Sequence, residues 1–150
     1  MTPFSTNGRV RVADRHNPRG LIDTSVVIDL AQIDAAALPS QIAISAVTLA
    51  ELGAGPPATA DPAERARRQD RLQRTEATFD SLPVDGAVAR AYGRVYAAVA
   101  AARRKTRGRR AFDLLIVATA LAAELPLYTR NPSDFQELEG LVEVIAVPAS

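Results

Sequence analysis

The chain has 150 residues, of which 47% are hydrophobic, and this apolar content suits one domain with its own core rather than a disordered binding segment. Its 18 basic and 17 acidic residues leave a net charge of +1, so attraction to nucleic acid must come from a local patch. The sequence has no cysteine and a single histidine, His16, which excludes disulfides, thiolate nucleophiles, serine-type triads and paired-histidine nucleases.

The segment 1–19 is polar and contains Pro3, Gly8 and Pro18, so we expect a flexible leader that folding does not require. It has no apolar stretch of the kind found in signal peptides, and no apolar run elsewhere is long enough to span a membrane. We therefore expect a soluble cytoplasmic protein whose folded domain covers 20–150.

Predicted strands and helices alternate along the rest of the chain. Short apolar runs predict strands at 20–23, 41–45, 127–129 and 142–147. Apolar residues at helical spacing, with Gly and Pro at the ends, predict helices at 24–30, 47–53, 62–79, 88–102 and 110–124. The third and fourth of these helices are expected to form a hairpin. Because such alternation needs crossovers, it predicts an α/β fold with a mostly parallel sheet covered by helices on both faces.

Three carboxylates each stand in an apolar stretch. Asp23 lies in Leu-Ile-Asp-Thr-Ser, Glu51 in Leu-Ala-Glu-Leu, and Asp113 in Ala-Phe-Asp-Leu-Leu-Ile. Asp23 follows the first predicted strand, and Asn131 and Asp134 follow the third, so a parallel sheet places them at the same edge. Carboxylates are costly in apolar surroundings unless a cation is nearby, and several that converge predict a divalent-metal site that acts on phosphates.

Each of these acids also has a structural interpretation. Asp23 could cap the helix that follows it, but Thr24 or Ser25 can do so and leave Asp23 free for metal. Glu51 could belong to the exposed stripe of an amphipathic turn. Asp113 is expected in the first turn of its helix, where the helix dipole favours an anion, and its apolar neighbours favour a functional role.

Polar residues near the strand ends have similar alternatives. Asn131 and Asp134 could form a turn, and this role is compatible with metal binding. Thr129 offers a hydroxyl that could orient a carboxylate or a metal-bound water, and it also suits a strand. Ser45 and Thr48 are interpreted as caps of the helix that follows the second strand.

One strongly basic stretch leads directly into Asp113. A run of like charge is usually a solvated loop, but this position places it beside the acids, where it could hold a phosphate backbone. Its cationic residues are Arg103, Arg104, Lys105, Arg107, Arg109 and Arg110. The arginines at 65–71 form a second group, which is interpreted as surface because Glu64 and Asp70 can neutralise it along a helix.

The order of four motifs resembles that of the PIN-domain ribonucleases, and in particular that of VapC-type toxins of type II toxin–antitoxin pairs. The motifs are Leu-Ile-Asp-Thr-Ser, Ala-Glu-Leu, Phe-Asp-x-x-Ile-x-Ala-Thr-Ala and Thr-Arg-Asn-Pro-x-Asp-Phe, and the likeness covers 20–147. The resemblance implies a Rossmann-like α/β/α sandwich and an endoribonuclease that depends on Mg²⁺ or Mn²⁺. It implies cleavage of structured cellular RNA, such as transfer or ribosomal RNA, which inhibits translation.

The resemblance also implies partners. They are a second copy of the chain and a cognate VapB-like antitoxin that silences the toxin, in a complex that can bind operator DNA through the antitoxin. For the homodimer we expect contacts through the apolar sides of the helices at 26–30 or 49–52.

The family's site residues can be placed on this chain. Those matching its first three acids are Asp23, Glu51 and Asp113, and those expected to support them are Thr24, Ser25 and Thr129. The fourth acid falls within 129–135, where many members have Asp in place of Asn131. Whether Asn131 or Asp134 completes the metal shell is open; we expect Asp134, with Asn131 as a neutral ligand. With fewer charges, we expect one tightly held metal and a second recruited with substrate.

Three alternatives have specific signatures. A receiver domain needs a Lys after a late strand, and Lys105 does not lie there. A phosphatase with an Asp nucleophile needs Asp-x-Asp, and the stretch after Asp23 lacks the second acid. A catalytically weak PIN-like module that binds RNA or antitoxin stays open because Asn131 is not an acid. Metal-dependent cleavage would separate a nuclease from such a module.

Overall fold

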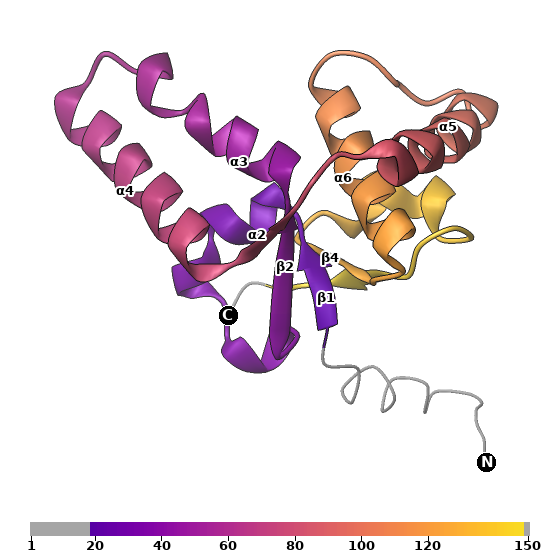
Figure 1. The fold of residues 1–150 in the computed structure, drawn as a ribbon, viewed down its shortest axis with the longest axis horizontal. Coiled ribbons are helices and arrows are strands. Elements are labelled where there is room, and N and C mark those ends of the chain that lie inside the picture. The colour runs from indigo at the N-terminus through magenta and orange to yellow at the C-terminus, as the bar shows by residue number, and fades with distance from the viewer. Residues whose placement is uncertain (1–18, 149–150) are drawn as a thin grey trace.

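The structure is a computed structural model that describes residues 19–148, and in this part of the chain a five-stranded sheet lies between two helical layers (Figure 1). All neighbouring strands are parallel, in the order β3-β2-β1-β4-β5. The strands are β1 (Arg19–Ile22), β2 (Gln41–Ser45), β3 (Asp80–Leu82), β4 (Leu127–Thr129) and β5 (Val144–Ala146). The predicted α/β/α sandwich with a mostly parallel sheet is confirmed.

Long helices and short 3₁₀ turns connect these strands. The α-helices are α2 (Thr24–Ile28), α3 (Ala46–Gly53), α4 (Pro62–Thr78), α5 (Gly86–Ala101) and α6 (Arg109–Ala123). The 3₁₀ segments are η1 (Leu30–Gln32), η2 (Ala35–Ala37), η3 (Pro56–Ala58) and η4 (Pro132–Leu138). Within residues 19–148, no helix combines the length and the apolar character needed to cross a membrane.

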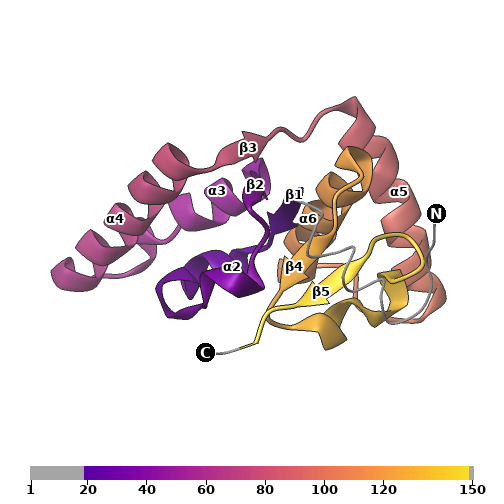
Figure 2. The same ribbon diagram turned by 90° about the horizontal axis from the view of Figure 1, so that it is seen from below.

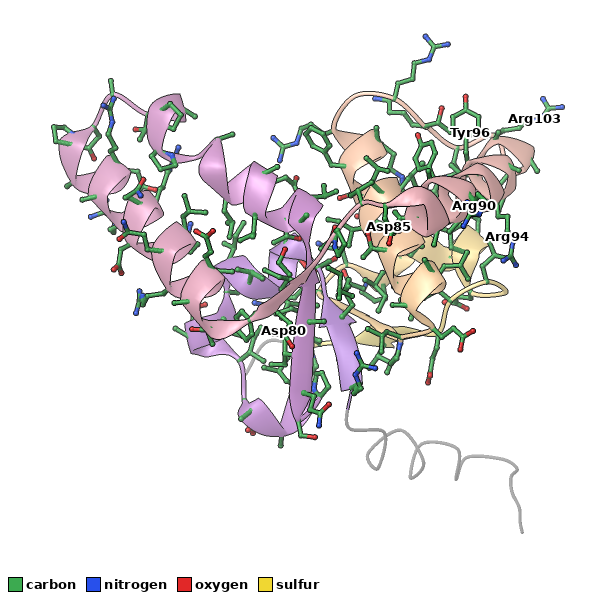
Figure 3. All side chains as sticks on the ribbon, in the orientation of Figure 1. Asp80, Asp85, Arg90, Arg94, Tyr96 and Arg103 are labelled. Carbon is green, nitrogen blue, oxygen red and sulfur yellow. The ribbon has the colours of Figure 1, made fainter. Side chains whose placement is uncertain are left out.

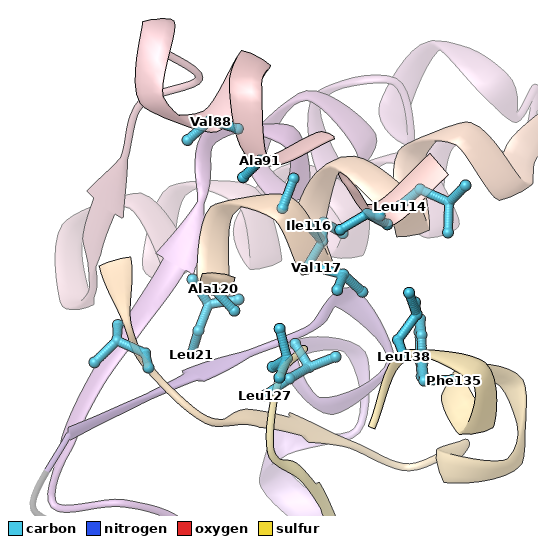
Figure 4. Packing of buried hydrophobic residues seen from close by; sticks show 14 of the residues in the cluster. Leu21, Val88, Ala91, Leu114, Ile116, Val117, Ala120, Leu127, Phe135 and Leu138 are labelled. Atoms are coloured by element: carbon cyan, nitrogen blue, oxygen red, sulfur yellow. The ribbon is translucent and has the colours of Figure 1, made fainter. Parts of the chain in front are cut away.

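Both faces of the sheet are buried, which explains why its central strands read as continuous apolar runs. Adjacent residues point to opposite faces, so Leu21 and Leu127 enter one core while Ile22 and Tyr128 enter the other. Figure 4 shows the first core between α5, α6, η4 and the sheet. The second core lies under α2 and α4 on the opposite face.

The two long helices in the middle of the chain do not form the predicted hairpin. α4 packs on α3 and belongs to the second core, whereas α5 packs on α6 and belongs to the first. Figure 2 shows β3 between them. β3 has the polar sequence Asp80-Ser81-Leu82 and pairs with β2 at the sheet edge, so it has no apolar pattern to predict it.

Element boundaries agree closely with the predictions in two strands, β2 and β4. β1 begins at Arg19, which the sequence had assigned to the leader. Residues 1–18 lie outside the described residues, so the flexible leader stays a prediction. α2 ends at Ile28 and is followed by η1, so the predicted helix to residue 30 is divided into two short segments.

Candidate active site

Asp23 lies at the carboxyl end of β1, where the backbone turns into α2. Its N–H donates to the carbonyl of Tyr128 at 3.0 Å, and its Oδ1 accepts from Ser25 Oγ at 2.6 Å and from Val26 N at 3.2 Å. Asp23 is therefore itself the N-cap of α2. The prediction that Thr24 or Ser25 would cap this helix is wrong, because neither hydroxyl faces the free backbone N–H groups.

Thr24 instead connects Asp23's helix to Glu51. Its Oγ1 donates to Glu51 Oε1 at 2.6 Å and lies 3.0 Å from Thr48 Oγ1. A hydroxyl has one proton, so Thr48 must donate to Thr24.

Ser45 caps α3, as predicted, by accepting from Val47 N at 3.0 Å. Thr48 is not a cap but a fully buried member of this hydroxyl chain, which its spacing of three from Glu51 on one helix face could have indicated.

Hydrogen bonds that involve Ser25 and Thr129 hold the end of β4 at the same edge of the sheet. Both residues were predicted to support the acids. Arg130 N donates to Ser25 Oγ at 3.2 Å, and the buried Thr129 hydrogen-bonds to Asp23. Burial raises the pKa of Asp23, while the hydrogen bonds from Ser25 and Thr129 oppose that rise. Arg130 also pairs with Asp29 Oδ2 at 2.7 Å, a contact that the sequence did not predict.

The pKa of Asp113 depends on the charges of the other predicted acids. Burial is the main reason that its pKa rises to about 6; Arg110 lowers it, and Glu51, Asp23 and Asp134 each raise it. Three carboxylates from other segments of the chain thus lie near enough to Asp113 to disfavour its charged form. Asp113 lies in the second turn of α6, not in the first as predicted, so proximity to the helix N-terminus does not explain its position.

Asn131 and Asp134 lie at the start of η4, in the predicted turn. Asp134 N donates to the carbonyl of Asn131 at 3.0 Å, and Asn131 N donates to Thr129 Oγ1 at 3.0 Å. Both residues are exposed, and the side chain of Asn131 forms no capping hydrogen bond. Only Asp134 of the two adds charge that acts on Asp113.

The donor chemistry of the site fits a hard cation such as Mg²⁺. Within residues 19–148, no three acids or histidines approach closely enough to form a ready ligand set. Hydrogen bonds and ion pairs nevertheless bring the acids to one region, since Thr24, next to Asp23, bonds to Glu51, and Arg110 contacts both Asp113 and the Asp134 carbonyl. The two observations agree with Mg²⁺ chemistry, because this ion keeps several water ligands and commonly takes only one or two carboxylates.

The structure separates the predicted RNA-binding cations into two kinds. Residues 103–109 lie between the body of α5 and that of α6, and their cationic side chains are largely exposed (Figure 3 labels Arg103). Arg104 and Arg110 both pair with Glu137, at 3.4 and 3.1 Å, but the side chain of Arg104 is 43% exposed and that of Arg110 only 11%. Arg110 is thus less accessible than the cations at 103–109, and its part in RNA binding stays a prediction. Glu137, 27 positions away, has no local sequence signal.

A groove of about 430 Å³ lies on the other side of the molecule, between α2, η1 and α4. It contains none of the predicted site residues. Apolar side chains such as Ile28 form one wall, and Arg67, Arg71 and Arg74 line the other. Val26 and Leu52 are buried in the second core, so the predicted dimer faces at 26–30 and 49–52 are mostly unavailable, and Ile28, 47% exposed, is the main apolar exception.

A five-stranded parallel sheet with helices on both faces and acids at its carboxyl edge defines an α/β protein of the nuclease-like PIN type. The chain belongs to the PIN-domain family, whose model matches residues 20–141. It is 38% identical over 133 residues to Ribonuclease VapC5 of Mycobacterium tuberculosis, which covers 85% of this chain and 95% of the relative. It is 40% identical over 102 residues to Ribonuclease VapC8 of the same species, covering 67% of this chain and 89% of the relative. The resemblance predicted from the motifs is confirmed.

Solved structures agree with this assignment. The chain matches the VapBC-5 toxin–antitoxin structure from Mycobacterium tuberculosis with a TM-score of 0.74 and 38% identity, covering 88% of this chain and 99% of that one. It also matches VapBC2 of Rickettsia felis bound to a promoter DNA fragment, with a TM-score of 0.68, 21% identity, and coverage of 84% and 98%. At that identity, the second match shows the fold alone.

Proposed function

We propose that this chain is a metal-dependent endoribonuclease that acts as the toxin of a toxin–antitoxin pair. The observation that carries the proposal is that Asp23 at the end of β1, Glu51 hydrogen-bonded to Thr24, and Asp113 linked through Arg110 to Asp134 lie at the carboxyl edge of the sheet. The 38% identity to a protein named as a VapC ribonuclease supports the same activity.

The side chains have separate roles in this proposal. Asp23 and Asp113 hold Mg²⁺ or Mn²⁺, and Asp134 completes the acidic site in preference to Asn131. Thr24 keeps Glu51 oriented through its 2.6 Å hydrogen bond. A bound divalent ion supplies an acidified water and offsets charge on the phosphate, so no side chain needs to act as nucleophile. The products then carry a 5′-phosphate and a 3′-hydroxyl.

The substrate we propose is structured cellular RNA, such as transfer or ribosomal RNA, whose cleavage inhibits translation and growth. The exposed basic residues at 103–109 lie on the segment that enters α6, only a few residues before Asp113. Cations in that place attract the phosphate backbone without reading base sequence. Specificity for one RNA must then come from the shape of the surrounding loops.

The partner we propose is a VapB-like antitoxin, and the free toxin is proposed to be a homodimer. Asp113 has a side chain that is 43% exposed, so a partner's Arg can reach it and compete with metal. The related structures come from VapBC complexes, one of which is bound to promoter DNA. By analogy, the complex of this chain would bind operator DNA through its antitoxin.

The test is to incubate the purified chain, freed of co-purifying partner, with total cellular RNA with and without Mg²⁺ or Mn²⁺. Asp113→Asn is the matched variant, because Asn keeps the size and loses the charge. Discrete metal-dependent cuts with 5′-phosphate ends, absent in the variant, are expected. RNA binding without cleavage under either metal would favour the catalytically weak PIN-like module, and Asn131→Asp would then be tested for restored cleavage.

A further inference from the structure

Arg110 occupies an unfavourable position for a cation. It is the second residue of α6, and the N-terminal turn of a helix carries partial positive charge. Its side chain is only 11% exposed, so water does little to stabilise the guanidinium. A buried cation at such a point requires strong partners, and these come from a distant part of the chain.

The partners of Arg110 are residues of η4 that lie close together in sequence. One guanidinium nitrogen of Arg110 lies 3.1 Å from Glu137 Oε2 and also donates to the carbonyl of Asp134. The guanidinium carbon lies 5.2 Å from the centre of the Phe135 ring. Glu137 is itself only 8% exposed. Arg110 therefore joins the start of α6 to the segment that bears Asp134.

The same guanidinium also faces the first predicted acid of its own helix. Its second terminal nitrogen lies 3.7 Å from Asp113 Oδ2, one turn further along α6. A planar fork with several donors can contact Asp113 and η4 together, which a lysine ammonium cannot do with the same geometry. One side chain thus links the two segments that carry Asp113 and Asp134.

We propose that Arg110, held by Glu137, is a positioning residue that sets η4 against α6 so that Asp134 faces Asp113. This inference rests on the proposed function of the acids as the catalytic site. It differs from the role predicted for Arg110 in RNA binding, because the guanidinium is engaged by Glu137, Asp113 and the Asp134 carbonyl within the chain. It also differs from support of the fold, because Phe135 and Leu138 already anchor η4 in the first core, with 3% and 0% exposure.

Two conservative variants test the inference in the full chain. Arg110→Lys keeps the charge and loses the fork, and Glu137→Gln keeps the shape and loses the negative partner. Arg94→Lys is the matched control, because Arg94 is exposed on α5 (Figure 3). The measurements are thermal unfolding, Mn²⁺ binding to the free protein by electron paramagnetic resonance, and kcat and KM on an RNA that the wild type cuts.

Both variants are expected to stay folded, to bind Mn²⁺ about tenfold more weakly and to lose about 10-fold to 100-fold in kcat, the range seen when groups that orient metal ligands are removed. The KM for RNA is expected to stay within about twofold in Arg110→Lys, since the exposed cations are intact. Glu137→Gln also removes the 3.4 Å pair of Arg104 with Glu137, so KM is read in Arg110→Lys alone. Arg94→Lys should behave as wild type. A raised KM with unchanged Mn²⁺ affinity would instead make Arg110 an RNA contact and overturn the proposal.

Failure of the inference is distinguishable from failure of the proposed function. If the wild type cuts no RNA with Mn²⁺, the nuclease proposal fails, while Mn²⁺ affinity still reports whether Arg110 orders the acids. If the wild type cuts RNA and both variants match it in Mn²⁺ affinity and kcat, the positioning role is wrong. Should Arg110→Lys not fold, Glu137→Gln alone decides by the same two readouts.

Discussion

Two regions of this molecule contain arginine–glutamate ion pairs that have similar N···O distances but different roles. On α4, Arg67 and Arg68 approach Glu64 to 2.8 and 2.9 Å, three and four positions along one helix. At the junction of α6 and η4, Arg110 approaches Glu137 to 3.1 Å. The pairs on α4 are neighbours in sequence and reach solvent, whereas the junction pair is remote in sequence and nearly buried.

The comparison shows that distance alone does not measure what an ion pair contributes. Solvent screens the α4 pairs, and their partners would be adjacent on any helix of this sequence. The junction pair forms only in the folded chain, and removing one member leaves the other charge buried. The same contrast separates the two sides of the molecule, since the acids lie beside the junction and the α4 arginines line a groove away from them.

The largest expected effect comes from the acids beside the junction. Asp113→Asn or Asp23→Asn should lower RNA cleavage by more than about 100-fold, because a ligand is lost and not merely a group that orients one. Circular dichroism should show the fold retained, since Asn has nearly the same shape. Full cleavage in either variant would show that the substituted acid is not part of the catalytic site. The junction region would then not differ from α4 in its role in catalysis.

The junction pair gives the next effect. Glu137→Ala should lower the free energy of unfolding by about 2 kcal/mol, because Arg110 loses its nearest carboxylate and keeps only the Asp134 carbonyl and the more distant Asp113. Urea denaturation measures this change. Glu139→Ala is the control, since Glu139 is exposed at the end of η4 and should change stability by less than about 0.5 kcal/mol. Equal effects of the two substitutions would contradict the special role of the junction.

The hydroxyl chain should produce a smaller loss. Thr24→Val removes the hydrogen bond to Glu51 and leaves the buried Thr48 without its acceptor, so stability should fall by about 1 kcal/mol. Cleavage should fall about tenfold as Glu51 loses its orientation. Thr24→Ser keeps the hydroxyl and should restore most of both losses. If serine does not rescue, packing of the methyl group matters more than the hydrogen bond.

The dependence of stability on pH tests the acid site further, without breaking any ion pair. Burial raises the pKa of Asp113 from an ordinary 3.8 to about 6, so between these values the folded chain binds more protons here than the unfolded chain. The free energy of unfolding of metal-free wild type therefore falls across this window as pH rises. Asp113→Asn lacks this loss and should gain stability relative to wild type from pH 3.8 to about 6. A constant difference would be inconsistent with the raised pKa.

The smallest effect is expected on α4. Asp70→Asn breaks the pair with Arg74, which lies at 2.8 Å with side chains 59% and 77% exposed, respectively. The free energy of unfolding should change by less than about 0.5 kcal/mol, and RNA cleavage should not change. A loss comparable to that of Glu137→Ala would show that exposure does not distinguish the two regions.

The alternation of strands and helices, the parallel sheet and the edge at which the acids gather could all be predicted from the residue pattern. Its apolar runs reproduce β2 and β4 to the residue, because a buried parallel strand must be apolar on both faces. The motif order also indicated the family. These features depend on neighbours in the chain, whose spacing is visible without a fold.

Which polar groups contact one another could not be predicted and depends on how whole elements pack. β3 is a strand because β2 offers it an edge, although Asp80-Ser81-Leu82 has little strand character of its own. Thr24 bonds to Glu51 and Arg110 pairs with Glu137, each across 27 positions of the chain. Each outcome joins residues far apart in sequence, so packing of whole elements fixes the partners, and no local pattern contains that information.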